Sequence, residues 1–171
     1  MQFNRRQSGQ GKQFKRGGES AFPPERRGCA AMSPTILVTG AAGFIGSHTA
    51  QTLLARGDTV VGLDNLNEYY DPAGKQANLQ ELARSPGAAH FSFVRGDIRD
   101  RELGGRLCGQ HEFVAVVHLA AMSGVRVSIE NSHLYYDVNV NGTLTLVEAA
   151  REAQTPPLCL HRPPRPLAIP R

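Results

Sequence analysis

Short runs of β-branched and apolar residues alternate along the chain with longer segments of helical periodicity. The apolar runs are residues 35–39 (TILVT), 59–63 (TVVGL), 91–95 (FSFVR) and 113–119 (FVAVVHL). Continuous apolar runs of this length are typical of strands buried on both faces of a parallel sheet. Because each run is followed by a segment with helical character, the order predicts an α/β fold with right-handed crossovers and about four parallel strands.

Helices are expected over residues 73–84, 99–108 and 134–153, and over an earlier segment that ends at Gly57, which can form a left-handed C-cap. Their buried faces follow from the helical period of 3.6 residues. Residues at helical spacing mark the first helix, namely Ile45, Thr49, Leu53 and Leu54. Leu79 and Leu82 lie on one face of the second helix, and the residues predicted to face inward in the last are Leu144, Val147 and Ala150.

The two ends of the chain differ in composition from the middle. Residues 1–31 carry 7 basic and 2 acidic side chains and show no periodicity, so we predict a disordered basic tail, with Met32 as an alternative start. Residues 155–171 hold six prolines in 17 positions, a density that excludes a helix or a central strand. The predicted folded domain is therefore residues 32–154, with no fifth strand after it.

Charge and cysteine content narrow the function classes. The net charge of +4 comes from the two ends, since residues 32–154 carry 9 basic and 13 acidic side chains, and this distribution does not favour a nucleic-acid partner. The three cysteines are scattered without a CxxC pair, which argues against a disulfide framework or metal site and fits a reducing compartment such as the cytoplasm. No run approaches the roughly 18 apolar residues of a membrane span.

The strongest chemical signal is TGAAGFIG at residues 39–46, where the first strand gives way to a helix. In such a motif Gly40 permits the tight turn, Gly43 lets the backbone approach a pyrophosphate, and Gly46 lets the helix pack closely on the strand. Asp64 ends the second strand 18 residues after Gly46, where a carboxylate accepts bonds from ribose hydroxyls and favours NAD over NADP. The pattern predicts a dinucleotide site; the alternative role for Asp64 is a surface turn.

Polar residues also end the third and fourth strands. Asp97 could bond the adenine amino group, with Ile98 packing on the ring, or could instead cap the helix over residues 99–108. We interpret His118 as a packed or hydrogen-bonded strand residue rather than a catalyst. Asn139 could hydrogen-bond either the cofactor or the backbone.

Five blocks, TGAAGFIG, DNLNEYYDP, GDIRD, HLAAMSGVR and YYDVNVNGTL, together resemble the extended short-chain dehydrogenase/reductase family of NAD-dependent nucleotide-sugar epimerases and dehydratases. The resemblance covers residues 34–154. The second block looks most like the UDP-glucuronate 4-epimerase branch, although UDP-galactose 4-epimerases share the YYDxNVNGT run. The resemblance implies a truncated Rossmann-type doubly wound parallel sheet, NAD as cofactor, a UDP-sugar as partner, and a homodimer.

The resemblance also implies roles for individual residues. Phe44 and Ile45 would pack under the NAD pyrophosphate, Asp64 and Asn65 would bind the adenosine ribose, and Asp97 and Ile98 would bind adenine. The nicotinamide side would be supported by Asn139 and lined by Leu119, Ala120, Ala121 and Ser123. Arg126 would approach the sugar nucleotide.

In this family a Tyr acts as base while hydride moves between sugar C4 and NAD, and a Lys four residues later lowers the pKa of that Tyr. No Tyr here has such a Lys: the only lysines are Lys12, Lys15 and Lys75, and Tyr69 and Tyr70 precede Lys75 in a loop expected far from the site. We therefore expect the NAD-binding part of an epimerase with little or no turnover. The alternatives are a non-catalytic NAD-binding or partner-pairing module, and part of another sugar-nucleotide epimerase or dehydratase.

The proline-rich end has two explanations. Read from the last base of the His161 codon onward, the codons permit SSSSAFGDTP, which resembles the serine run and aromatic–glycine pair of the family at this point. A frameshift would then account for residues 155–171. The alternative is a natural proline-rich tail.

Overall fold

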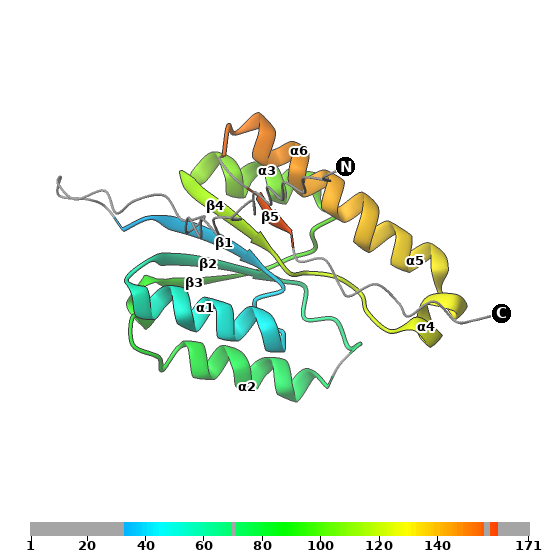
Figure 1. Ribbon diagram of the computed structural model, residues 1–171, viewed down its shortest axis with the longest axis horizontal. Helices are drawn as coiled ribbons and strands as arrows, with labels where there is room; N and C mark the ends of the chain where they lie inside the picture. The colour runs from blue at the N-terminus through cyan, green and yellow to red at the C-terminus, as the bar shows by residue number, and fades with distance from the viewer. Residues whose placement is uncertain (1–32, 70, 156–157, 161–171) are drawn as a thin grey trace, which may run out of the picture. The chain divides into compact units, whose positions relative to one another are not determined.

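The computed structural model describes residues 33–69, 71–155 and 158–160, and its elements are labelled in Figure 1. The predicted basic tail, the residue Tyr70 and most of the proline-rich end lie outside the described residues. The strands are β1 (Thr35–Thr39), β2 (Thr59–Asp64), β3 (Phe91–Arg95), β4 (Phe113–His118) and β5 (Leu158–Leu160). The helices are α1 (Phe44–Arg56), α2 (Pro72–Leu82), α3 (Arg101–Gln110), α4 (Val125–Glu130), α5 (Ser132–Tyr136) and α6 (Thr143–Glu152), with a 3-10 turn η1 (Ala88–His90) and a π-helical segment η2 (Asp137–Gly142).

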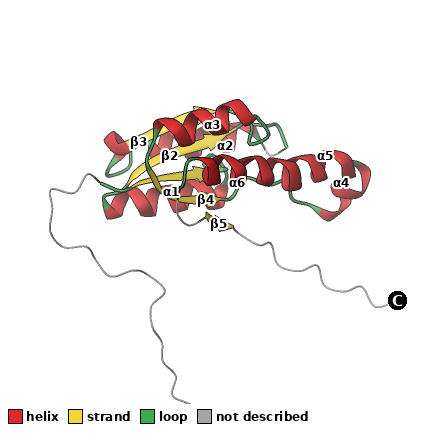
Figure 2. Ribbon diagram, turned by 90° about the horizontal axis from the view of Figure 1, so that it is seen from above, coloured by secondary structure: helices red, strands yellow, loops and turns green. Residues whose placement is uncertain are grey.

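The strands form one parallel sheet in the order β3-β2-β1-β4-β5, with helices on both faces. Figure 1 shows α1 and α2 on one face and α3 and α6 on the other. Figures 1 and 2 both show α5 and α6 continuing in one line. The predicted α/β fold and its four strands are confirmed. None of the helices in the described part of the chain has the length and apolar character that a bilayer crossing requires.

The strand β5 corrects the expectation that the proline-rich end adds no strand. Leu158, Cys159 and Leu160 pair in parallel with the last three residues of β4. These three positions lie between Pro157 and Pro163 and none of them is proline, so each keeps the N–H that a parallel ladder requires. Proline density over the whole segment concealed this short proline-free stretch.

Pairing in register brings the carboxyl ends of the central strands to one edge. Thr39, the last residue of β1, pairs with Leu63 of β2 on one side and with His118 of β4 on the other. The loops that follow all three strands therefore leave the sheet side by side, and this edge is where open α/β sheets bind their ligands.

The first turns of the helix α1 pack on the sheet through small side chains. Its buried residues are Gly46, Ser47, Ala50 and Leu54, whereas Ile45 is 51% exposed. A helix this close to the strands has room only for small residues in its first turns, and the predicted apolar residues Leu53 and Leu54 pack on the core further along the helix. Gly57 caps the helix in the left-handed conformation, as predicted, with its N–H donating to main-chain carbonyls of the last turn.

The long helix expected over residues 134–153 is interrupted by the π-helical segment η2. Leu146 is 2% exposed and Leu144 is 54% exposed. The prediction that Leu144 faces inward was wrong, whereas Ala150 is buried as expected. Leu144 and Ala150 both lie in α6, and at 3.6 residues per turn their side chains point about 120° apart, so they cannot share one buried face.

The corrected helix register predicts unequal effects of two neighbouring leucine substitutions. Leu146→Ala should lower the free energy of unfolding by about 3 kcal/mol because it leaves a cavity in the core between α6 and the sheet. The matched control Leu144→Ala should change it by less than about 0.5 kcal/mol. Urea denaturation of the two variants measures the difference, and equal losses would contradict the assigned register.

Candidate functional site

The glycine-rich loop lies where β1 meets α1, in a close approach of three backbone segments. The Gly40 N–H donates to the Leu63 carbonyl of β2 at 2.7 Å, and the Gly43 N–H donates to the Gly40 carbonyl at 3.0 Å. Gly40 has φ +71°, which favours glycine, and a Cβ there would lie 2.8 Å from the main-chain nitrogen of Ala120. The loop is therefore fixed against both neighbours of β1.

Gly46 sets the distance between α1 and this loop. A Cβ at Gly46 would lie 2.0 Å from the Gly40 carbonyl oxygen, and one at Gly43 would lie 3.2 Å from the same atom. Only glycine fits at Gly46, and the cradle at Gly43 has almost no room for a side chain. The close packing that the sequence pattern predicts for Gly46 is present.

The first turn of α1 points its main-chain N–H groups toward the carboxyl edge of the sheet. No side chain caps this end, since the N-cap residue is Gly43. Phe44 is 76% exposed, and Ile45 beside it is half exposed. An uncapped N-terminus next to a glycine loop is suited to bind an anionic group, because its N–H groups and the helix dipole favour negative charge there.

Asp64 lies at the end of β2, next to the glycine loop, and is buried. Its Oδ2 accepts from the Ala42 N–H at 3.2 Å, and its Oδ1 accepts from the Leu66 N–H at 2.8 Å. Leu66 has a positive φ of 54°, so the chain turns sharply after the strand. The alternative role of Asp64 as a surface turn residue does not fit its 7% exposure.

Two residues of α2 reach this site without having been predicted. Lys75 Nζ lies 3.3 Å from Asp64 Oδ1 and donates to Asn67 Oδ1 at 2.9 Å. Asn78, one turn later, donates to the Ala42 carbonyl at 2.8 Å. Lys75 lies in the helix predicted over residues 73–84, but its contact with Asp64 was not predicted. The two polar residues spaced three apart on α2 were the available signal.

Asp97 follows β3 and carries the hydrogen bonds of an ionised carboxylate. It accepts from Asn65 Nδ2 at 3.1 Å and from the Arg99 guanidinium at 2.9 and 2.8 Å. Bonding to Arg99, aided by Asn65, lowers the pKa of Asp97 to about 2 against the opposing effect of partial burial. Arg99 also pairs with Asp137 at 2.8 Å, and these two carboxylates raise its pKa. The N-cap of α3 is Asp100, not Asp97.

Ile98 is 8% exposed and belongs to the core beneath α6. A Cβ at Gly142 would lie 2.7 Å from Ile98 Cδ1, so the π-helical segment packs directly on this side chain. The side chain is therefore turned into the protein rather than toward the carboxyl edge.

After β4, the loop of Leu119, Ala120 and Ala121 is fixed by a buried threonine. The N–H groups of Leu119 and Ala120 each donate to Thr39 Oγ1 at 3.2 Å. Since that oxygen accepts twice, its own proton is donated to His118 Nδ1, 2.6 Å away. His118 Nε2 then carries the ring proton and donates to Thr143 Oγ1 at 3.1 Å. Burial lowers the pKa of His118, and the predicted hydrogen-bonded role is confirmed.

Asn139 clamps the same loop from the π-helical segment. Its Oδ1 accepts from the Met122 N–H at 2.8 Å, and its Nδ2 donates to the Met122 carbonyl at 2.9 Å. Both main-chain groups of one residue are thus held by one amide. Asn139 was expected to hydrogen-bond either the cofactor or the backbone, and in the structure it bonds the backbone.

Two tyrosines join the loop after β2 to the loop after β4. Tyr69 and Tyr135 both donate to the Ser123 carbonyl, the latter at 2.7 Å, and their hydroxyls lie 2.9 Å apart. The expectation that Tyr69 lies far from the site was wrong. Arg126, on α4, is exposed.

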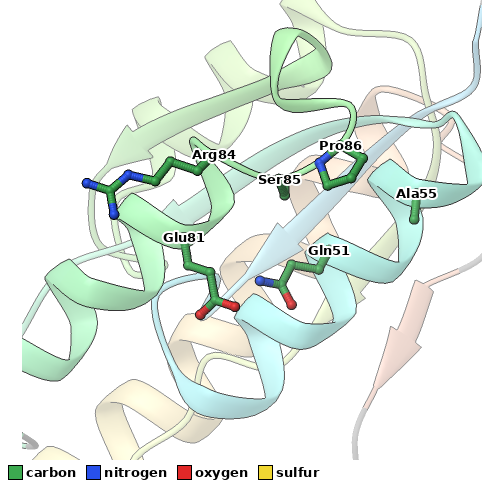
Figure 3. A pocket seen from close by; sticks show the side chains of 6 residues that line it. All are labelled: Gln51, Ala55, Glu81, Arg84, Ser85 and Pro86. Atoms are coloured by element: carbon green, nitrogen blue, oxygen red, sulfur yellow. The ribbon is translucent and has the colours of Figure 1, made fainter.

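Two hollows differ in their relation to this edge. One of about 300 Å³ lies between the loops after β2, β3 and β4, and is lined by Asn65, Asn67, Glu68, Tyr69, Arg99, Met122, Leu134 and Val138. The other, of about 400 Å³, lies near the C-terminal ends of α1 and α2 and is lined by Gln51, Ala55, Glu81, Arg84, Ser85 and Pro86 (Figure 3). Only the first adjoins the predicted site residues.

Comparison with known proteins identifies relatives over most of the described region. Residues 37–161 match the family described as GDP-mannose 4,6 dehydratase. UDP-glucuronate 4-epimerase 4 of Arabidopsis thaliana is 45% identical over 123 residues, which are 72% of this chain and 27% of that protein. The chain thus spans about a quarter of the length of this relative.

Solved structures with the same fold contain NAD. A UDP-glucose-4-epimerase of Stenotrophomonas maltophila with bound NAD matches with a TM-score of 0.66 and 32% identity, over 75% of this chain and 36% of that one. A dTDP-glucose 4,6-dehydratase of Streptomyces venezuelae with NAD bound matches with a TM-score of 0.62 and 38% identity, over 72% of this chain and 38% of that one.

Because burial lowers the pKa of His118, we expect the free energy of unfolding to fall in mild acid. The unfolded chain takes up a proton at this side chain as the pH falls below about 6.5, whereas the folded chain resists it because the pKa is lowered. Stability present above pH 6.5 should therefore be lost as the pH falls through the folded pKa. Asp97 acts separately, since its lowered pKa removes stability only between about 3.8 and about 2.

Urea denaturation at pH 7.5 and at pH 5 measures this loss. His118→Gln, which cannot take up a proton, should show a smaller loss between the two pH values than the unaltered chain. An identical loss in both proteins would contradict the assigned role of His118.

Proposed function

The chain belongs to the family of NAD-dependent sugar-nucleotide epimerases and dehydratases, and we propose that it forms the NAD-binding part of an enzyme of the UDP-glucuronate 4-epimerase type. The observation that carries the proposal is the contact of Gly46 with the Gly40 carbonyl, which brings the uncapped N-terminus of α1 to the carboxyl edge beside Asp64. That arrangement provides N–H donors for a pyrophosphate and a carboxylate for a ribose at one site.

The chemistry of the glycine-rich loop supports NAD as the ligand. Gly43 has no side chain that would cover the main-chain N–H groups at the start of α1, so a phosphate could approach them closely. The exposed Phe44 and Ile45 flank the N–H groups that would face the phosphates. The 300 Å³ hollow beside Asn65 offers room for part of the adenosine.

The individual contacts proposed for NAD follow the strand ends. Asp64 and Asn65 would hold the adenosine ribose, and Asp97 would accept from the adenine amino group. Because the Ile98 side chain is buried in the core, its proposed part in adenine binding is limited to the main chain. Loop residues fixed by Thr39 and by the Asn139 clamp would line the nicotinamide side: Leu119, Ala120, Ala121 and Ser123.

UDP-glucuronate is the proposed sugar nucleotide because several UDP-glucuronate 4-epimerases of Arabidopsis thaliana are 41 to 45% identical to this chain. Arg126 is exposed on α4 and is the residue proposed to approach the substrate. The chemistry that NAD supplies when bound is reversible hydride transfer at the sugar C4.

The sequence contains no Tyr followed by Lys at the fourth position, so no residue pair here is proposed as the base. We propose that these residues bind and orient NAD without turning over UDP-glucuronate by themselves. A coupled assay that detects UDP-galacturonate formed by the chain alone would overturn this part of the proposal.

Oligomerisation and location stay predictions. Tyr136, Val140 and Leu144 are 60%, 45% and 54% exposed at four-residue spacing along the α5–α6 line, which makes this face a candidate for the predicted homodimer. Sedimentation analysis of the chain distinguishes monomer from dimer. The cytoplasm is the predicted compartment, and cell fractionation tests it.

The proposed NAD site predicts a charge-specific loss of affinity. Asp64→Asn should weaken NAD binding by about tenfold or more, because it removes a charged acceptor from the ribose. The matched control is Asp58→Asn at the opposite end of β2, where Asp58 is equally buried and pairs with Arg56. Calorimetric titration with NAD should give the control a Kd within about twofold of the unaltered chain. Equal weakening in both variants would contradict the proposed role of Asp64.

A further inference from the structure

Lys75 is a buried cation at the adenosine end of the site. Its side chain is 10% exposed and the carboxylate of Asp64 is 7% exposed, with 3.3 Å between Nζ and Oδ1. Asn67 Oδ1 accepts a second hydrogen bond from the same ammonium at 2.9 Å. Asp64 is therefore not an isolated negative charge but one half of a buried ion pair.

We propose that Lys75 weakens the discrimination against a 2′-phosphate, so that the site binds NADP as well as NAD, with NAD preferred. This inference rests on the proposed NAD site. It makes Lys75 a positioning and specificity-setting residue that acts through Asp64 rather than a catalytic residue.

NAD and NADP differ at the ribose 2′ position, where NADP carries a phosphate and NAD a hydroxyl. A carboxylate in the position of Asp64 accepts from the ribose 2′-hydroxyl, and it repels a phosphate attached there. The positive charge of Lys75 lies 3.3 Å from the same carboxylate, so at the distance of a 2′-phosphate the ammonium offsets part of the repulsion by Asp64. Because the pair is buried, salt in solution screens it little.

Hydrogen bonds to Asp64 favour the same difference between the two cofactors. Asp64 Oδ1 already accepts from the Leu66 N–H and from Lys75. Removing the ammonium frees an acceptor position for a ribose hydroxyl and leaves the carboxylate charge uncompensated. NAD, which offers hydroxyls, should then bind as well as before or better, whereas NADP should bind more weakly.

The test is calorimetric titration of the full chain with NAD and with NADP. The Kd of the unaltered chain for NADP should be measurable and within about a hundredfold of its Kd for NAD. In Lys75→Gln the ratio of the two Kd values, NADP over NAD, should rise by about tenfold. Lys75→Arg keeps the charge, and its ratio should stay within about threefold of the unaltered chain.

Asn78→Ala is the matched control on the same helix. Asn78 supports the glycine loop through the Ala42 carbonyl but carries no charge, so its loss should weaken both cofactors by similar factors and leave the ratio unchanged. A ratio that moves as far in Asn78→Ala as in Lys75→Gln would assign both residues to structural support and overturn the inference.

The outcomes separate the inference from the proposed function. If the unaltered chain binds neither cofactor, the proposed NAD site fails. If it binds NAD but Lys75→Gln weakens NAD and NADP in parallel, the NAD site stands and the inference fails. Undetectable NADP binding by the unaltered chain would also overturn the inference, and this measurement needs no folded variant.

Discussion

The contact between Gly46 and the Gly40 carbonyl determines where the other parts of the site can lie. A single methyl group at Gly46 would come within 2.0 Å of that oxygen, so the helix approaches the loop as closely as backbone allows. The approach selects small residues, Ser47 and Ala50, for the next two buried positions of the helix. It also leaves Phe44 and Ile45 in solvent at the helix start. Exposed apolar side chains at this point are a consequence of the packing that presents the N–H groups.

Buried and half-buried polar side chains fix the three loops around this contact. Asn78 donates to the Ala42 carbonyl, and Thr39 accepts from two N–H groups after β4. Asn139 bonds both the N–H and the carbonyl of Met122. Among the described residues, every buried side-chain nitrogen or oxygen has a hydrogen-bond partner. Because an unpaired polar group is costly in a dry environment, each such contact resists loop movement. The carboxyl edge is thus ordered by the protein's own hydrogen bonds.

The elements predicted correctly from the sequence are those that short-range patterns determine. Four strands and the glycine turn were found in the sequence because β-branched runs and glycine spacing reflect backbone requirements directly. Leu144 was placed wrongly because two successive steps of three residues leave the face of a helix, so that Leu144 lies about 120° around α6 from the buried Ala150. The strand β5 was missed because three residues between prolines are too short a signal. Lys75 was missed because its partner Asp64 is 11 positions away, a contact created by the loop after β2.

Electrostatics at the carboxyl edge depend on pairing rather than on net charge. The folded region is mildly acidic, and Asp64, Asp97 and Asp137 all lie near the proposed adenosine site, yet Lys75 and Arg99 hold these carboxylates. The first turn of α1 contains no Lys or Arg, so attraction for a pyrophosphate there would come from oriented N–H groups and the helix dipole. Such dipoles act only at short range and in a fixed direction. An acidic domain can therefore hold an anionic cofactor only while the start of α1 stays in place. The close approach of Gly46 to the Gly40 carbonyl keeps it there.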